Sequence, residues 1–125
     1  MTVLDTSVLI DSFCGTKRSA PALRAVIEAG ERIVLPSLVL YEWLRGPRLA
    51  AEIAAQEALF PSAAALLFGP REASLSADLY RRVKRPRGRE IDLAIAACAL
   101  VRDADFWTLN RTDFSDIPHL RLRHF

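Results

Sequence analysis

Residues 2–11 are TVLDTSVLID, a short apolar run that ends in an acid and continues into further apolar residues. The first five of these residues predict a buried strand. Ser7–Phe13 predict a helix that Thr6 or Ser7 could cap. In an open α/β sheet, sites form at the carboxyl ends of the strands, and Asp5 stands at this position. Asp5 is therefore the first candidate functional residue.

The rest of the chain alternates strand patterns with helix patterns. Further strands are predicted over Arg32–Leu35, Ala63–Phe68, Asp105–Leu109 and Leu120–Phe125, the last at an edge. Further helices are predicted over Ala20–Ala29, Ser37–Arg45, Leu49–Leu59, Arg71–Lys84 and Ile91–Val101. This alternation predicts an α/β fold with a central parallel sheet of about five strands, covered by helices on both faces. Residues 1–125 fit one domain of this kind.

Composition and cysteine usage favour a compact protein of a reducing compartment. About half of the residues are apolar (51%), which is enough for one packed core. Cys14 and Cys98 lack metal-ligand spacing, and Cys98 lies in an apolar run that predicts a buried reduced thiol. The N-terminus carries acids where a signal peptide carries bases, and no apolar stretch is long enough to span a bilayer. We expect a cytoplasmic protein with no membrane partner.

Several polar residues fall where this fold brings strand and helix ends together. Asp5 ends the first strand, and Asn110 and Asp113 follow the fourth. Glu42 lies in the helix that leaves the second strand, and Asp92 opens the helix that leads into the fourth. Because right-handed crossovers keep strand directions consistent, all five can converge at one edge.

Each of these residues also has a purely structural interpretation. Asp5 could cap the next helix, and Asp92 suits the first turn of a helix because of the macrodipole. Asn110 and Asp113 are ordinary turn residues. Glu42 could be a surface acid, although apolar residues flank it on both sides. Taken together, these interpretations do not explain why the acids select one edge.

Clustered carboxylates in an apolar crevice repel one another and lose hydration, so the cluster needs a compensating cation. Mg²⁺ or Mn²⁺ fits, since both are hard cations that take oxygen ligands. Neither histidine nor cysteine lies near these positions, which argues against zinc. A metal held this way can activate a water and stabilise charge on a phosphate.

The same motifs resemble those of PIN domains, and of VapC-type toxins in particular. VLDTSVLID (3–11) resembles their opening strand, LVLYEWLRG (38–46) their second acidic motif, and EIDLAIAACA (90–99) the third. WTLNRTDF (107–114) and IPHLRL (117–122) resemble the closing segment of the toxins. Each motif is loose, but their order and spacing over almost the whole chain are specific.

The resemblance implies an Mg²⁺-dependent endoribonuclease that is the toxin of a type II toxin–antitoxin pair. It implies an RNA substrate, a homodimer and inhibition by a cognate antitoxin protein. It also implies catalytic and metal-binding roles for Asp5, Glu42 and Asp92, supported through hydrogen bonds by Ser7 and Thr108.

The fourth acidic position of the family aligns with Asn110, which is an amide in this chain. Asp113 is the other candidate for that position and would supply the missing charge. The sequence leaves open which of the two fills it, and whether the site holds one metal or two.

A basic run covers the end of the fifth predicted helix and the residues after it, although the net charge of the whole chain is only +2. We expect this run to flank the active edge and bind RNA phosphates. The alternative is a solvated helix end whose cations complement the dipole, but six cations exceed what capping needs. The run consists of Arg81, Arg82, Lys84, Arg85, Arg87 and Arg89.

Three other classes of protein are alternatives to this hypothesis. A phosphatase or dehalogenase with Asp5 as nucleophile needs a second acid two residues on, where this chain has Ser7. A phosphoacceptor receiver domain needs a lysine near its end, and no lysine follows Lys84. A catalytically impaired PIN domain that binds RNA or a protein partner remains the alternative, and Asn110 is the feature in its favour.

Overall fold

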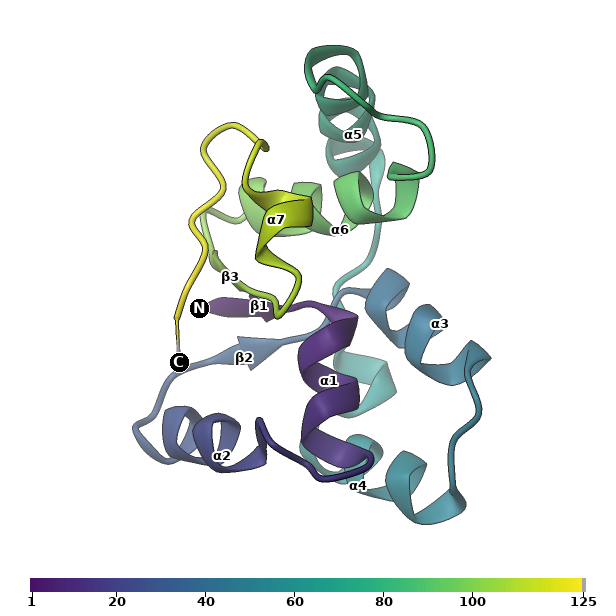
Figure 1. Cartoon of the computed structure of the whole chain (residues 1–125), viewed down its shortest axis with the longest axis vertical. Helices are drawn as coiled ribbons and strands as arrows, with labels where there is room; N and C mark the ends of the chain where they lie inside the picture. Colours follow the sequence, from purple (N-terminus) through teal and green to yellow (C-terminus); the bar gives the residue numbers. More distant parts are fainter. Residues whose placement is uncertain (125) are drawn as a thin grey trace.

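A parallel sheet with the strand order β2-β1-β3 lies at the centre of the chain, with helices packed around it (Figure 1). The computed structural model describes residues 1–124. The three strands are β1 (Thr2–Leu4), β2 (Ile33–Val34) and β3 (Asp105–Trp107). The α/β class expected from the sequence is confirmed.

The register of the sheet places the ends of the strands at the same edge. Val3 of β1 is the partner of Val34 on one side and of Phe106 on the other. All pairs are parallel, so Leu4 and Trp107 end their strands side by side. Asp5 therefore emerges at the carboxyl edge of the sheet, in the central strand.

Two of the five expected strands are reduced to single bridges. The segment Ala63–Phe68 contributes a 3-10 turn, η1 (Ser62–Ala64), and one parallel bridge from Leu66 to Pro36. Proline lacks a backbone donor, so pairing cannot extend through this position as a regular ladder. At the other edge, Leu122 bridges Phe106. Both segments lie where the sequence placed strands, but the sheet has three strands among residues 1–124, not about five.

The helices match the predicted positions closely, and one short helix was not predicted. The extra helix is α7, which forms in the segment that the sequence assigned to a turn. The helices are α1 (Thr6–Phe13), α2 (Ala20–Glu28), α3 (Ser37–Arg45), α4 (Ala50–Leu59), α5 (Pro70–Arg82), α6 (Glu90–Leu100) and α7 (Arg111–Phe114).

The residue at the N-cap position of α1 is Asp5, not Thr6 or Ser7 as predicted, and this difference affects the site. Asp5 is the N-cap residue, and its side chain makes no capping hydrogen bond. Ser37 likewise does not cap α3, which begins after Pro36 in extended conformation. The carboxylate of Asp5 is therefore available for contacts other than those of a helix cap.

The central helix α6 explains how the sheet is covered so closely. Residues Leu93–Ala99 are all buried, and four of them are alanines. Small side chains allow the helix backbone to approach β1 and β3, which both contact α6. This packing fixes the start of α6 relative to the carboxyl ends of the strands.

The remaining expectations on burial concern the cysteines and the membrane. Cys98 is fully buried, as predicted, and burial raises the pKa of its thiol to about 11. Cys14 is half-buried, and neither residue forms a disulfide. Among residues 1–124, no helix has the length and apolar character needed to cross a bilayer.

Candidate active site

Asp5 is the buried centre of the site. Its backbone N–H donates to the Trp107 carbonyl at 2.9 Å, which locks the residue to β3. Only 4% of Asp5 is exposed, and burial raises the pKa of its carboxyl above the ordinary value. The Asp5 carboxyl group is therefore largely shielded from solvent.

Two hydroxyls hold the Asp5 carboxylate in one orientation. The hydroxyl of Thr108 donates to Oδ2 at 2.7 Å, and that of Ser7 donates to the same oxygen at 3.0 Å. Each hydroxyl in turn accepts a backbone N–H at 3.0 Å, from Asn110 and Leu109 respectively. These acceptor bonds direct both hydroxyl protons towards Asp5. Ser7 and Thr108 thus both contact Asp5, one of the acids that they were predicted to support.

Glu42 is tied to the same region through α1. The hydroxyl of Thr6 donates to Glu42 Oε1 at 2.6 Å, and Arg45 lies 3.5 Å from Oε2. The Glu42 side chain is 18% exposed, so the apolar flanks in the sequence do indicate a sheltered acid. The bond from Thr6 links α3 to the start of α1, one residue beyond Asp5.

Asp92, in the first turn of α6, completes the group of acids. Its carboxyl pKa is raised to about 6, first by burial and then by the negative charges of Asp5, Glu42 and Asp113. Repulsion of this kind acts over short distances, so the four carboxylates share one region. Figure 1 shows the starts of α1, α3 and α6 around the carboxyl ends of the strands. The convergence expected from topology is therefore present in the fold.

Asn110 and Asp113 occupy the rim of this region. Asn110 is the N-cap residue of α7, and Asp113 lies in its single turn. Both are exposed, unlike Asp5. The charge of Asp113 reaches Asp92, as the raised pKa of Asp92 indicates.

The donor set of this region suits a hard divalent cation. Within residues 1–124, no three Asp, Glu, His or Cys side chains converge tightly enough to chelate one ion by themselves. Mg²⁺ does not require this, because it usually takes one or two carboxylates and keeps several waters. Asp5 and Asp92 could supply those carboxylates, and Glu42 lies beside them. Burial first, and then the charges of neighbouring acids, raise the pKa values of Asp5 and Asp92, so a bound cation would be favourable there.

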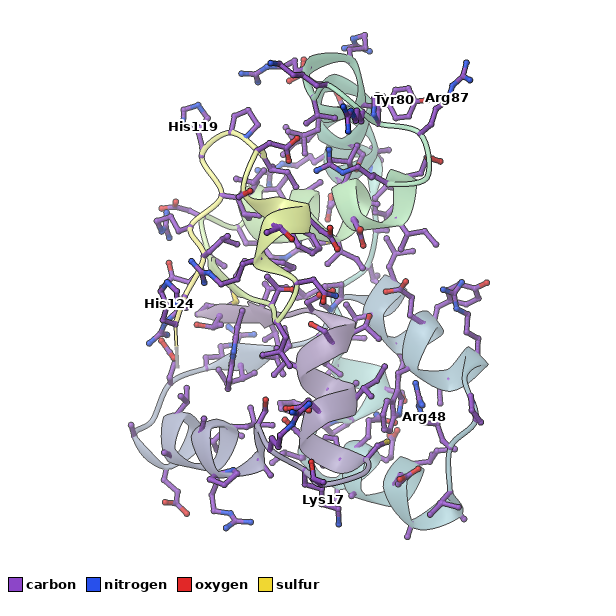
Figure 2. The ribbon with its side chains drawn as sticks, in the orientation of Figure 1. Lys17, Arg48, Tyr80, Arg87, His119 and His124 are labelled. Carbon is purple, nitrogen blue, oxygen red and sulfur yellow. The ribbon has the colours of Figure 1, made fainter. Side chains whose placement is uncertain are left out.

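The six basic residues of the predicted run have different surroundings. Arg81 and Arg82 pair with Asp78 on their own helix, at 3.7 Å and 3.2 Å. Arg89 pairs with Asp116 at 2.6 Å. The other three, Lys84, Arg85 and Arg87, are exposed in the loop between α5 and α6, and Figure 2 shows Arg87 pointing away from the body of the protein.

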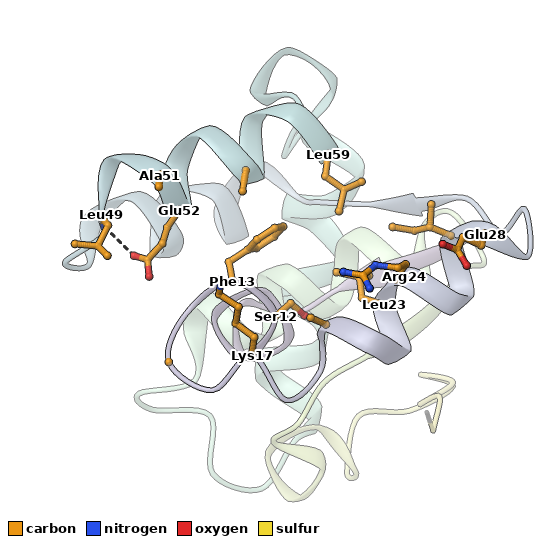
Figure 3. Close-up of a pocket in the computed structure, with 14 residues that line it drawn as sticks. Ser12, Phe13, Lys17, Leu23, Arg24, Glu28, Leu49, Ala51, Glu52 and Leu59 are labelled. Carbon is orange, nitrogen blue, oxygen red and sulfur yellow. Dashed lines mark hydrogen bonds between the residues drawn. The ribbon is translucent and has the colours of Figure 1, made fainter.

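A separate hollow of about 740 Å³ lies between the end of α1, α2 and α4. Figure 3 shows Phe13, Leu23 and Leu59 on its wall, with Ser12 at its base. None of the clustered carboxylates lines it. The site is therefore defined by charge and hydrogen bonding at the sheet edge, not by the depth of a pocket.

Three contacts around the site were not foreseen from the sequence. Thr6 was considered only as a helix cap, whereas its hydroxyl bonds to Glu42. Arg45 and the partner of Arg89, Asp116, were not singled out. A three-residue spacing between Glu42 and Arg45 on a helix is a signal that could have indicated their contact. No comparable signal points to the other two contacts.

Comparisons with known proteins agree with this arrangement. Residues 2–120 match the family model described as the PIN domain. The chain is 36% identical over 123 residues to Ribonuclease VapC19 of Mycobacterium tuberculosis, covering 97% of this chain and 98% of that protein.

Solved structures share the fold at lower identity. VapBC2 from Rickettsia felis, bound to a DNA fragment from its promoter, has a TM-score of 0.74 at 17% identity and covers 99% of this chain and 98% of its own. A toxin–antitoxin complex from Klebsiella pneumoniae has a TM-score of 0.73 at 23% identity, with coverage of 99% and 97%. The family match and the full-length relative together show that the chain belongs to the PIN-domain family, as a homologue of the VapC ribonucleases.

Proposed function

We propose that this chain is a metal-dependent endoribonuclease, formed by a single PIN domain, and the toxin of a type II toxin–antitoxin pair. The observation that carries the proposal is the buried carboxylate of Asp5, which two hydroxyls orient and which shares its region with Glu42 and Asp92. The full-length similarity to a VapC ribonuclease supports the same activity.

Asp5, Asp92 and Glu42 are the residues that would hold the ion, Mg²⁺ or Mn²⁺. Once bound, such an ion lowers the pKa of a coordinated water and offsets charge on a phosphate. Ser7 and Thr108 fix the Asp5 carboxylate, so that it keeps one geometry while the substrate enters. Asn110 and Asp113, on the exposed rim, are the groups placed to orient water or add one more oxygen ligand.

A cleavage assay tests the proposal directly. The purified protein should cut an RNA pool of randomised sequence with Mg²⁺ or Mn²⁺ and lose this activity in excess chelator. Asp5→Asn should abolish cleavage, because the substitution removes the central charge but preserves size. The matched control is Asp103→Asn, an acid at the opposite end of the strands. Undiminished cleavage in chelator would refute the metal dependence.

The alternative function is an impaired PIN domain that binds RNA or a protein without cutting. The amide at Asn110 favours it, because an all-acid site would hold metal more firmly. Binding of the same RNA pool with no Mg²⁺-dependent products would establish this alternative.

The loop between α5 and α6 is the proposed RNA-binding segment, extended by the last turn of α5. Its exposed cations are Lys84, Arg85 and Arg87. In the last turn of α5, Asp78 forms ion pairs with Arg81 and Arg82. Replacing the three exposed cations with Gln should weaken RNA binding and flatten its salt dependence, by about one slope unit or less per lost phosphate contact. An unchanged salt slope would return the loop to the role of a solvated surface.

Protein partners follow from the same family. The solved relatives are complexes of toxins with antitoxins, and we propose a cognate antitoxin and a homodimer for this chain as well. Exposed apolar side chains, among them Tyr41, Leu44 and Leu67, offer surface that a protein partner would cover. Light scattering of the purified protein, alone and with its co-expressed antitoxin, measures both associations.

A further inference from the structure

Arg89 differs from the other cations of the basic run in its contacts. Its two terminal nitrogens donate to both carboxylate oxygens of Asp116, at 2.9 Å and 2.6 Å. One of them also donates to the backbone carbonyl of Asp113 at 2.9 Å. This is the two-pronged geometry that makes an arginine–carboxylate pair directional as well as strong.

Arg89 is also more buried than the neighbouring arginines of the basic run. Its side chain is 19% exposed, against 70% for Arg81 and 50% for Arg82. A guanidinium that is mostly enclosed and already holds three acceptor atoms has little capacity left for a phosphate. Its position therefore indicates a role inside the fold.

The two segments that Arg89 joins both carry site residues. Arg89 is the N-cap residue of α6, three positions before Asp92. The acceptors lie within and just after α7, the short helix that follows Asn110 and includes Asp113. The guanidinium therefore connects the start of α6 to the rim of the carboxylate cluster.

The helix α7 depends on such an anchor. It spans only Arg111–Phe114, far below the length at which a helix is stable by itself. Phe114 anchors one side of it in the core, where its ring contacts Phe106 with centroids 4.8 Å apart. Arg89 provides the polar attachment on the side that faces α6.

We infer that Arg89 is a positioning residue for the reaction: through Asp116 and the Asp113 carbonyl it holds α7 against α6 and so sets Asn110 and Asp113 beside Asp92. This inference rests on the proposed ribonuclease function. It removes Arg89 from the RNA-binding run and gives it an internal role.

Substitution of its partner separates this role from phosphate binding. Asp116→Asn keeps the charge of Arg89 but removes the carboxylate with which it makes the two-pronged contact. If Arg89 positions α7, single-turnover cleavage of the randomised RNA pool at saturating enzyme should fall by about tenfold to a hundredfold, because small displacements in a site are that costly. The RNA Kd, measured in an Asp5→Asn background, should stay the same.

A phosphate-binding Arg89 gives the opposite result. Freed from Asp116, it would bind RNA more tightly, with a lower Kd and an undiminished cleavage rate, and this outcome would overturn the inference. Arg89→Lys provides a second test, since lysine keeps the charge but cannot make the two-pronged contact. The clamp predicts a slow enzyme with an unchanged Kd for this variant too, whereas a phosphate contact predicts near-normal cleavage.

Asp103→Asn is the matched control, because Asp103 also accepts from an arginine at 2.6 Å but lies at the other end of the sheet. It should cleave like the wild type. Far-ultraviolet circular dichroism confirms that each variant is folded. Failure of the wild type to cleave would refute the proposed function, whereas normal cleavage by both Asp116→Asn and Arg89→Lys would refute the clamp alone.

Discussion

Acidic residues cluster at both ends of the central sheet, but their interaction partners differ between the two ends. At the amino end, Arg121 contacts Asp103 and Asp105, and Arg123 contacts Glu31. At the carboxyl end, Asp5 and Glu42 accept hydrogen bonds from hydroxyls, and the guanidinium of Arg45 lies 3.5 Å from Glu42. One cluster is neutralised within the fold, and the other is left with net negative charge.

The titration behaviour of the two ends follows this difference. The contact with Arg121 lowers the pKa of Asp103, whereas burial and neighbouring carboxylates raise the pKa of Asp92 to about 6. At the amino end the acids have arginine partners. At the carboxyl end the contact of Arg45 with Glu42 offsets only part of the negative charge, so a cation from solution should stabilise this cluster.

Removing an arginine partner of the acids at the amino end of the sheet should produce the largest change in the free energy of unfolding. Arg123 donates to Glu31 and to the Thr2 hydroxyl, and its side chain is 29% exposed. Arg123→Gln should lower the free energy of unfolding by about 1–3 kcal/mol, because it leaves a partly buried carboxylate without its partner. Urea denaturation measures the change, with Arg32→Gln as the control at an exposed arginine of the same edge. Equal stability of the two variants would show that the amino end is not held by this arginine.

The opposite sign is expected at the carboxyl end. In chelator, Asp92→Asn should raise the free energy of unfolding by about 1–2 kcal/mol, since the amide relieves repulsion in a partly solvated site. Mg²⁺ should then stabilise the wild type more than the variant. Thermal melts with and without Mg²⁺ give both quantities. A variant that responds to Mg²⁺ like the wild type would exclude Asp92 as a ligand.

The repulsion at Asp92 should also make the stability of the protein depend on pH. Folding raises the pKa of Asp92 from 3.8 to about 6, so the folded protein retains a proton that the unfolded chain releases. The contribution of this group to stability in chelator therefore declines as pH rises from about 4 to about 6. Asp92→Asn should flatten that part of the profile, as urea midpoints at several pH values would show. A profile of unchanged slope would mean that Asp92 titrates normally.

The smallest effect is expected at the rim. Asn110→Asp should add charge to the cluster and lower the Mg²⁺ concentration for half-maximal cleavage severalfold. Asn110→Ala should reduce turnover more than stability, because the residue is exposed and its side chain makes no capping hydrogen bond to α7. Thr112→Ala, at an exposed position of the same helix, is the control. If both Asn110 variants leave turnover and Mg²⁺ dependence unchanged, the role passes to Asp113.

Much of the fold was predictable because its strongest patterns are local. The apolar run Ile91–Val101 and the punctuation at Gly30 and Pro36 located the helices within a few residues. Strand pairing was less accessible, since it depends on backbone geometry that side-chain patterns do not encode. Leu120–Phe125 alternates like a strand, but among its residues up to 124 only Leu122 bridges to β3.

For the candidate site, topology predicted which acids lie near one another, but the sequence did not predict how their side chains are oriented. The rule that parallel strands end at one edge was sufficient to bring Asp5, Glu42 and Asp92 together. Which hydroxyl contacts which acid depends on rotamers and helix placement. The bond from Thr6 to Glu42 and the clamp between Arg89 and Asp116 arise at that level, so composition and spacing did not indicate them.

The distance in sequence between the groups at Asp5 has a consequence for folding kinetics. Thr108 donates to an acid 103 positions earlier in the chain, so this contact closes only when β3 has docked on β1. Repulsion among the carboxylates likewise develops late, after most of the apolar surface is buried. Relieving it should therefore slow unfolding while leaving the folding rate nearly unchanged, and a bound cation would act as a latch on the native state.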